Sequence, residues 1–183
     1  MKYKKPKIKS RELKASFLFS RRNFFDHTDF LAGFIDGQPP DPGQCFLPGT
    51  NILLANGRIQ EIEKIRAGEL VLSYDLKKQE IVKERVEKLL IHDDNTNSCF
   101  IINNFLKITA NHPVWINGLA WKRVDELCRN DVLLNSDGGK VVVESIKKIK
   151  KVSIVYNLHL HGNHHNYFAD NILVHNKSVC SGC

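Results

Sequence analysis

The stretch YFADNILVHN (Tyr167–Asn176) decides how the rest of the chain is interpreted. Its apolar middle, Ile172–Val174, predicts a short buried strand. Asparagine is a poor strand residue, so a buried strand that ends in His175-Asn176 indicates chemistry rather than packing. The Asn176 side-chain amide can attack its own backbone carbonyl, which closes a succinimide ring and cuts the chain before Lys177. His175 precedes that carbonyl and is a candidate to polarise it or to protonate the leaving amine.

Two further motifs lie upstream of this pair. They are CFLPGT at Cys45–Thr50 and TANHPVW at Thr109–Trp115. Together the three motifs resemble the Hint (Hedgehog/intein) family, and within it the bacterial intein-like domains. In that family's order, a cysteine opens the module, Thr-x-x-His lies in its middle and His-Asn closes it. The resemblance implies a Hint domain at residues 45–176, an N-terminal flanking segment at 1–44 and a short C-terminal tail at 177–183.

The chain from residue 45 onward is predicted to be all-β, because short apolar runs alternate with turn residues. Asn56-Gly57 predicts a tight hairpin, and Asn103-Asn104 predicts another. Short helical turns are expected at 64–68 and 124–127. Residues 152–160 alternate with period two, so one face of that strand is expected to be buried. The resemblance implies a horseshoe-like Hint fold in which the first and last strands lie side by side and both ends of the module meet.

Cys45 is the candidate nucleophile for the first boundary. Its thiol can attack the Gln44 carbonyl and convert the peptide bond into a thioester, an N–S acyl shift. The resemblance implies that His112 protonates the departing nitrogen, and that Thr109 hydrogen-bonds the scissile carbonyl or orients the site. The alternatives are a small buried hydrophobe at Cys45 and a turn-capping histidine at His112.

A second histidine is expected to act at the other boundary. His165 lies eleven positions before Asn176 and matches the family's second histidine, which implies that it activates the Asn176 amide or polarises its carbonyl. Histidines 159, 161 and 164 crowd the same segment, and zinc binding is the alternative there. A solvated turn explains that cluster more simply, so neither a metal nor a cofactor is predicted.

The sequence departs from the intein pattern at two positions. Inteins often carry aspartate where this chain has Asn157, so no carboxylate is available there to couple the two breaks. Splicing also needs Cys, Ser or Thr directly after the terminal asparagine, and Lys177 has neither a thiol nor a hydroxyl. The expected outcome is therefore cleavage at Gln44–Cys45 and at Asn176–Lys177, as in type B bacterial intein-like domains. Splicing through a displaced nucleophile such as Ser178 is the alternative.

The expected activity is a single-turnover reaction of a monomer on its own flanking peptides. Water, an external thiol or an external amine would take the acyl group from the thioester. The five cysteines of the chain are an odd number without framework spacing, which argues against a disulfide scaffold. A reactive Cys45 needs a reducing compartment, so processing is expected in the cytoplasm. No apolar run approaches the roughly 18 residues of a membrane span.

The first residues of the chain are strongly basic. Residues 1–22 contain nine Lys or Arg and a single acid, Glu12, in a chain whose net charge is +7. A solvated basic leader is the simplest interpretation. The alternative is a decayed Hint module that serves as a binding scaffold, with residues 1–25 as an arm that contacts nucleic acid. Ser20–Phe24 is similar to a twin-arginine export signal, but a polar stretch follows it, so export of a product is not favoured.

Overall fold

Strands dominate the described residues, which in this computed structural model are 44–93, 98–116, 118–149 and 154–176. All of them belong to one compact unit, residues 37–183. Apart from Gln44, the predicted flanking segment and the C-terminal tail, with Lys177 and Ser178, lie outside the described residues. The two helices in the described ranges are single 3-10 turns of three residues each, and neither could cross a membrane.

The first part of the unit contains these elements in chain order: β1 (Asn51–Leu53), β2 (Ile59–Glu61), η1 (Ile62–Lys64), β3 (Leu70–Asp75) and β4 (Glu80–Asp93). The middle part contains β5 (Cys99–Ile102), β6 (Leu106–Thr109), β7 (Pro113–Ile116), β8 (Ala120–Arg123), η2 (Val124–Glu126), β9 (Val132–Leu134), β10 (Lys140–Val142) and β11 (Ile146–Ile149). The last part contains β12 (Ile154–Leu160), β13 (Asn166–Ala169) and β14 (Ile172–His175). The prediction of an all-β domain with short helical turns is confirmed.

The predicted hairpins form because their turn residues accept a left-handed backbone. Asn56-Gly57 joins β1 to β2, and Gly57 has a φ of 80°. Asn103 and Asn104 join β5 to β6 with φ values of 49° and 63°. Asparagine tolerates this conformation better than most residues that have a side chain. The local turn chemistry therefore fixes these two registers.

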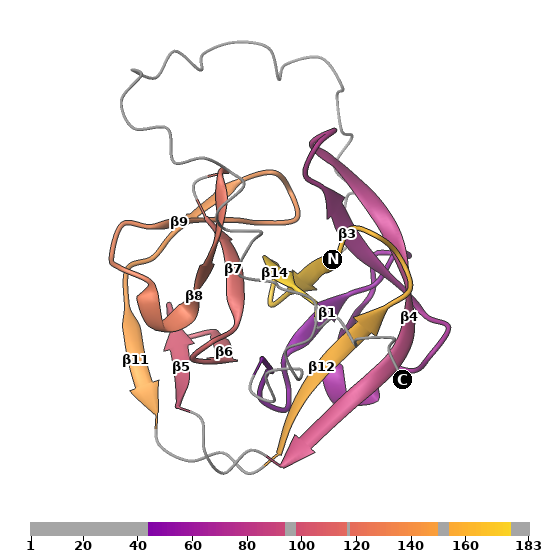
Figure 1. Ribbon diagram of the computed structural model, residues 1–183, viewed down its shortest axis with the longest axis horizontal. Coiled ribbons are helices and arrows are strands. Elements are labelled where there is room, and N and C mark those ends of the chain that lie inside the picture. The colour runs from indigo at the N-terminus through magenta and orange to yellow at the C-terminus, as the bar shows by residue number, and fades with distance from the viewer. Residues whose placement is uncertain (1–43, 94–97, 117, 150–153, 177–183) are drawn as a thin grey trace, which may run out of the picture. The chain divides into compact units, whose positions relative to one another are not determined.

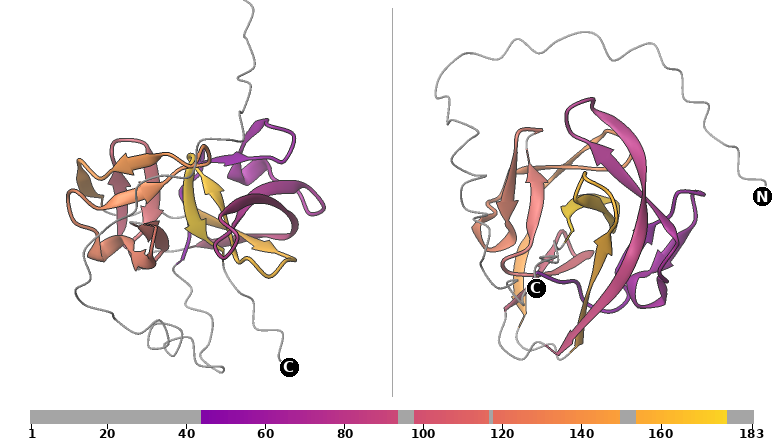
Figure 2. Two further views of the ribbon diagram at one scale, coloured as in Figure 1. Left: turned by 90° about the horizontal axis from the view of Figure 1, so that it is seen from above. Right: turned by 45° about the vertical axis from the view of Figure 1, so that its right-hand side comes forward.

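β14 runs through the middle of the described unit (Figures 1 and 2). It pairs with β13 on one side and with β7 on the other, and β13 in turn pairs with β1. β12, β4 and β3 form a separate three-stranded sheet, and β11, β5 and β6 form another. Ile172, Leu173 and Val174 are buried, as the sequence predicts. The last strand thus delivers His175 and Asn176 to the centre of the described unit.

The structure corrects two local expectations. The first helical turn forms at Ile62–Lys64 rather than at 64–68, because a 3-10 turn places Ile62 and Ile65 in the core together. Strand β12 has fully buried residues on both faces, since Val155 and Asn157 are as inaccessible as Leu158. On the second face, Asn157 contacts the Gln44 carbonyl instead of facing solvent.

The expectation that the first and last strands lie side by side is also corrected. The segment at Cys45 does not pair with β14: Phe46 pairs with Ile108 of β6 and with Tyr156 of β12. β1 reaches β14 only through β13. The two ends of the module therefore meet through intermediate strands and side chains.

Candidate active site

Cys45 lies in a short extended segment held between two strands. The Phe46 amide donates to the Tyr156 carbonyl over 2.7 Å, and the Tyr156 amide donates back over 2.8 Å. The side chains of Cys45 and Phe46 are completely buried. The Gln44–Cys45 peptide is thus fixed next to β12 and β6 before any reaction, which is the arrangement that makes an attack on a neighbouring carbonyl fast.

Thr109 contacts the nitrogen that would leave Gln44. The Cys45 amide donates to Thr109 Oγ1 over 2.8 Å, and the Thr109 hydroxyl donates to the Cys45 carbonyl over 3.1 Å. The scissile carbonyl of Gln44 has another donor, because Nδ2 of Asn157 lies 2.7 Å from its oxygen. Of the two roles that the resemblance implies for Thr109, the geometry fits orientation of the site and not contact with the scissile carbonyl.

His112 is buried between the two boundaries. Its ring packs on Phe46 with 4.3 Å between centroids, and Nε2 lies 2.9 Å from the His175 carbonyl oxygen. Since a carbonyl can only accept, Nε2 carries the proton. Nδ1 has no hydrogen bond within the described part of the chain, although the Cys45 backbone is close enough to affect the ring. Burial lowers the pKa of His112 to about 3, so the ring is neutral and Nδ1 is a free lone pair.

His175 holds the carbonyl at the second boundary. Its Nδ1 donates to the Asn176 carbonyl oxygen over 2.6 Å. The ring packs edge-on against Trp121, at 5.0 Å between centroids, and stacks at 6.4 Å on His165. Burial lowers the pKa of His175 to about 4. A neutral, fixed donor therefore lies where negative charge would develop during succinimide formation.

Asn176 is completely buried and held by backbone groups. Its amide donates to the His165 carbonyl over 2.9 Å. In the side-chain orientation that satisfies both atoms, Nδ2 also donates to the His165 carbonyl over 2.9 Å, and Oδ1 accepts from the Leu160 amide over 3.3 Å. His165 thus contacts Asn176 through its carbonyl, while its ring lies against His175. The register of β12 with β4 shifts between His159 and Leu160, which turns the Leu160 amide to this site.

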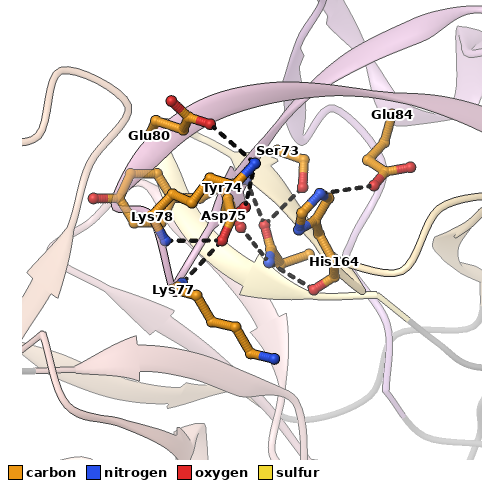
Figure 3. A network of polar contacts seen from close by, with 9 residues as sticks. Ser73, Tyr74, Asp75, Lys77, Lys78, Glu80, Glu84 and His164 are labelled. Carbon is orange, nitrogen blue, oxygen red and sulfur yellow. Dashed lines mark hydrogen bonds and ion pairs between the residues drawn. The ribbon is translucent and has the colours of Figure 1, made fainter.

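A buried asparagine anchors the loop before β13 to β3. Asn166 Oδ1 accepts from the Ser73 hydroxyl over 2.9 Å and from the Tyr74 amide over 2.8 Å. Its Nδ2 donates to the carbonyls of Tyr74 and His164, over 3.0 Å and 2.7 Å. Figure 3 shows this network, with the His164 ring turned toward Glu84. The network fixes the residue that follows His165, and so positions the carbonyl that receives Asn176.

Histidines 159, 161 and 164 lie beside carboxylates. His159 Nε2 lies 3.3 Å from Glu87 Oε2, and His164 Nε2 lies 3.8 Å from Glu84 Oε1. No group of three or more His, Cys, Asp or Glu among the described residues could hold a metal ion. The three histidines of the cluster thus each lie within 3.8 Å of a carboxylate of β4.

The structure gathers all six predicted site residues around His112 and β14. Sequence reasoning identified Cys45, Thr109, His112, His165, His175 and Asn176. It did not identify Leu160 or Tyr167, and it treated Asn157 only as a missing carboxylate. The sequence offered one signal that Asn157 belongs to the site: it is a polar residue in the middle of an apolar strand.

The sequence of the domain matches a known family. The family described as the pretoxin Hint domain matches residues 52–179. The chain belongs to this family. No curated protein matches this pretoxin Hint domain.

Solved structures with the same fold are bacterial intein-like domains and inteins. The bacterial intein-like domain from Clostridium thermocellum is 29% identical, with a TM-score of 0.66 over 73% of this chain and 99% of its own. A DnaB intein from Synechocystis is 22% identical, with a TM-score of 0.62 over 74% and 99% of the two chains. The Hint fold and the intein-like relationship that the motifs predict are confirmed.

Proposed function

We propose that this Hint domain cuts its own polypeptide at both boundaries, once at each. The observation that supports this most directly is the contact between His112 Nε2 and the His175 carbonyl, 2.9 Å long. It joins His112, whose ring packs on Phe46, with the peptide that carries Asn176. Neither a packing cysteine nor a turn-capping histidine requires such a contact.

At the first boundary, Cys45 Sγ attacks the Gln44 carbonyl carbon. The bond from that carbon to the Cys45 nitrogen breaks, and the nitrogen takes up a proton. The unprotonated Nδ1 of His112 can accept the thiol proton and return it to this amine, while Thr109 holds the nitrogen in place. Water, a thiol or an amine then takes the acyl group from sulfur and releases residues 1–44.

At the second boundary, Asn176 Nδ2 attacks the Asn176 carbonyl carbon. The bond to the Lys177 nitrogen breaks, and that nitrogen receives the proton that Nδ2 loses. The His165 carbonyl accepts the Nδ2–H in the resting state, and His175 Nδ1 stabilises the carbonyl oxygen. The products are a succinimide at residue 176 and a free amine at Lys177.

The first step requires a reduced thiol. Three cysteines lie in the described ranges: Cys45 and Cys99 are buried, and Cys128 is exposed. Cys45 can react only while it stays reduced, so we place processing in a reducing compartment such as the cytoplasm.

Mass spectrometry of the full 20.9 kDa chain tests the proposal. With added thiol, the chain should yield fragments that end at Gln44 and at Asn176. Cys45→Ala should abolish the first break only, and Asn176→Ala the second only. Cys128→Ala is the matched control, because it removes an exposed thiol away from the site. A chain that keeps its full mass for days, with and without thiol, would refute self-cleavage.

A further inference from the structure

The scissile carbonyl has a donor that the proposed chemistry has not yet used. Asn157 Nδ2 lies 2.7 Å from the Gln44 carbonyl oxygen, across 113 positions of the sequence. That oxygen gains negative charge when Cys45 attacks. A donor already in place at a developing oxyanion stabilises the transition state more than the ground state.

The orientation of the Asn157 amide is fixed by its other partners. Oδ1 accepts from the Leu158 amide over 2.7 Å and from the Tyr167 hydroxyl over 2.7 Å. A backbone amide can only donate and a carbonyl can only accept. If Oδ1 and Nδ2 exchanged places, Nδ2 would face the Leu158 amide donor and Oδ1 would face the Gln44 carbonyl oxygen. Nδ2 is therefore the atom that must face Gln44.

Tyr167 is suited to hold that orientation. Its side chain is completely buried. Burial raises the pKa of Tyr167 well above its ordinary value. The hydroxyl thus keeps its proton and remains a donor to Asn157 Oδ1 near neutral pH. Tyr167 belongs to β13, so its position is set by the same hairpin that carries Asn176.

We propose that Asn157 is a catalytic residue of the first break, whose amide stabilises the oxyanion at Gln44, and that Tyr167 positions it. The proposal rests on the proposed self-cleavage. It assigns asparagine a function that the corresponding carboxylate could not perform, since an ionised carboxylate only accepts hydrogen bonds. If Asn157 had only a structural role, its contribution would come from the hydrogen bonds that Oδ1 accepts from Leu158 and Tyr167.

Asn157→Asp separates these two roles, because it keeps the shape and the accepting oxygen but loses the donor. At about pH 8 the thiol-dependent release of residues 1–44 should slow by about 100-fold relative to the parent chain. Toward about pH 5 the deficit should shrink, since burial raises the pKa of a carboxyl and the protonated acid can donate. Tyr167→Phe should cause a smaller slowing with no such recovery.

Two internal controls accompany these variants. The break after Asn176, followed in the same samples, reports whether the variant still folds and should change by less than about threefold. Asn56→Asp makes the same chemical change in an exposed turn where only Oδ1 is used, and should leave both breaks unchanged. A slowing of the first break by Asn157→Asp that is equal at every pH, or no slowing at all, would overturn the proposal.

A readout without cleavage tests the contact itself. In a Cys45→Ala chain labelled with carbonyl-¹³C glutamine and ¹⁵N alanine, Gln44 is the one glutamine followed by an alanine, so its carbonyl gives one correlation peak. Asn157→Asp in this background should move the Gln44 carbonyl carbon upfield at about pH 8, because a hydrogen bond to its oxygen is lost. If the chemical shift of the Gln44 carbonyl carbon does not change, the contact with Asn157 is refuted even if cleavage occurs. If the shift changes but the parent chain never cleaves, self-cleavage and the catalytic role of Asn157 are refuted, while the contact itself is supported.

Discussion

His112 donates from Nε2 to the carbonyl oxygen of His175 over 2.9 Å, and this bond links the two ends of the module. His112 directly precedes β7 and His175 ends β14, and the two strands pair at Val114 and Val174. The histidine next to Cys45 thus also supports the peptide that presents Asn176. One side chain therefore contacts both ends of the module, although among the described residues no strand pairing joins the Cys45 segment to β14.

His112→Ala should impair both breaks to different degrees. The first break should slow by roughly 100-fold or more, because the proton shuttle at Nδ1 is lost. The second should slow by about tenfold, because the His175 carbonyl loses its donor in the interior. Time courses of the two fragments by mass spectrometry give both rates from one sample.

Thr109→Val is the control for this difference. It removes a hydroxyl that contacts the Cys45 backbone rather than β14, so only the first break should slow. Equal rates of the first break in His112→Ala and the parent chain would contradict the proton-shuttle role.

The two histidines near Asn176 should respond differently to substitution. His175→Ala removes the donor to the Asn176 carbonyl and should slow the second break by roughly 100-fold. His165→Asn keeps the carbonyl that receives Asn176, and asparagine tolerates the φ of 51° at this position, so the break should change by only about threefold. Fragment mass spectrometry again measures the rate. A loss in His165→Asn as large as in His175→Ala would show that the ring is needed.

The sequence predicted the parts of this domain whose causes are local. Asn56-Gly57 and Asn103-Asn104 specify their turns through their own backbone preferences. Side-chain chemistry indicated Cys45 and Asn176 as candidates, and the family resemblance added His112. The all-β class follows from the spacing of such turns. These features need no knowledge of which strand lies beside which.

The sequence could not predict contacts that depend on strand pairing. Asn157 contacts Gln44 because β12 pairs with the Cys45 segment at Phe46 and Tyr156, whereas the alternation of residues 152–160 predicted only one buried face. His165 contacts Asn176 through its carbonyl and Leu160 contacts it through its amide, and every residue except proline has both groups. The Leu160 amide is available because of a register shift, which has no signature in the residue types themselves.

The burial of neutral His112 should make folding stability depend on pH. Burial lowers its pKa from 6.5 to about 3, so between these values the unfolded chain binds the additional proton. Stability is complete above about pH 6.5 and decreases as the pH falls, by about 2 kcal/mol at pH 5 from this residue. Denaturant unfolding of a Cys45→Ala/Asn176→Ala chain, which stays intact, measures this loss.

His112→Gln in that background is the comparison. Glutamine can donate to the His175 carbonyl but does not titrate, so its loss of stability between about pH 7.5 and about pH 5 should be smaller by about 2 kcal/mol. His175, whose pKa burial lowers to about 4, contributes with the same sign in both chains. Parallel stability curves for the two chains would contradict a buried neutral His112.

Asn166→Ala should loosen the loop that carries His165. The substitution removes four hydrogen bonds that join Ser73, Tyr74 and His164 to the start of β13, in a fully buried position. We expect the free energy of unfolding to fall by about 2–4 kcal/mol, because buried backbone groups of Tyr74 lose their partner. The break after Asn176 should slow more than the break before Cys45, since Asn166 positions the His165 carbonyl and does not contact Cys45.

Ser73→Ala removes one of the four bonds and should cost about 1 kcal/mol, with little change in either rate. Equal slowing of both breaks in Asn166→Ala would indicate general unfolding and would contradict a specific role of this network at the second boundary.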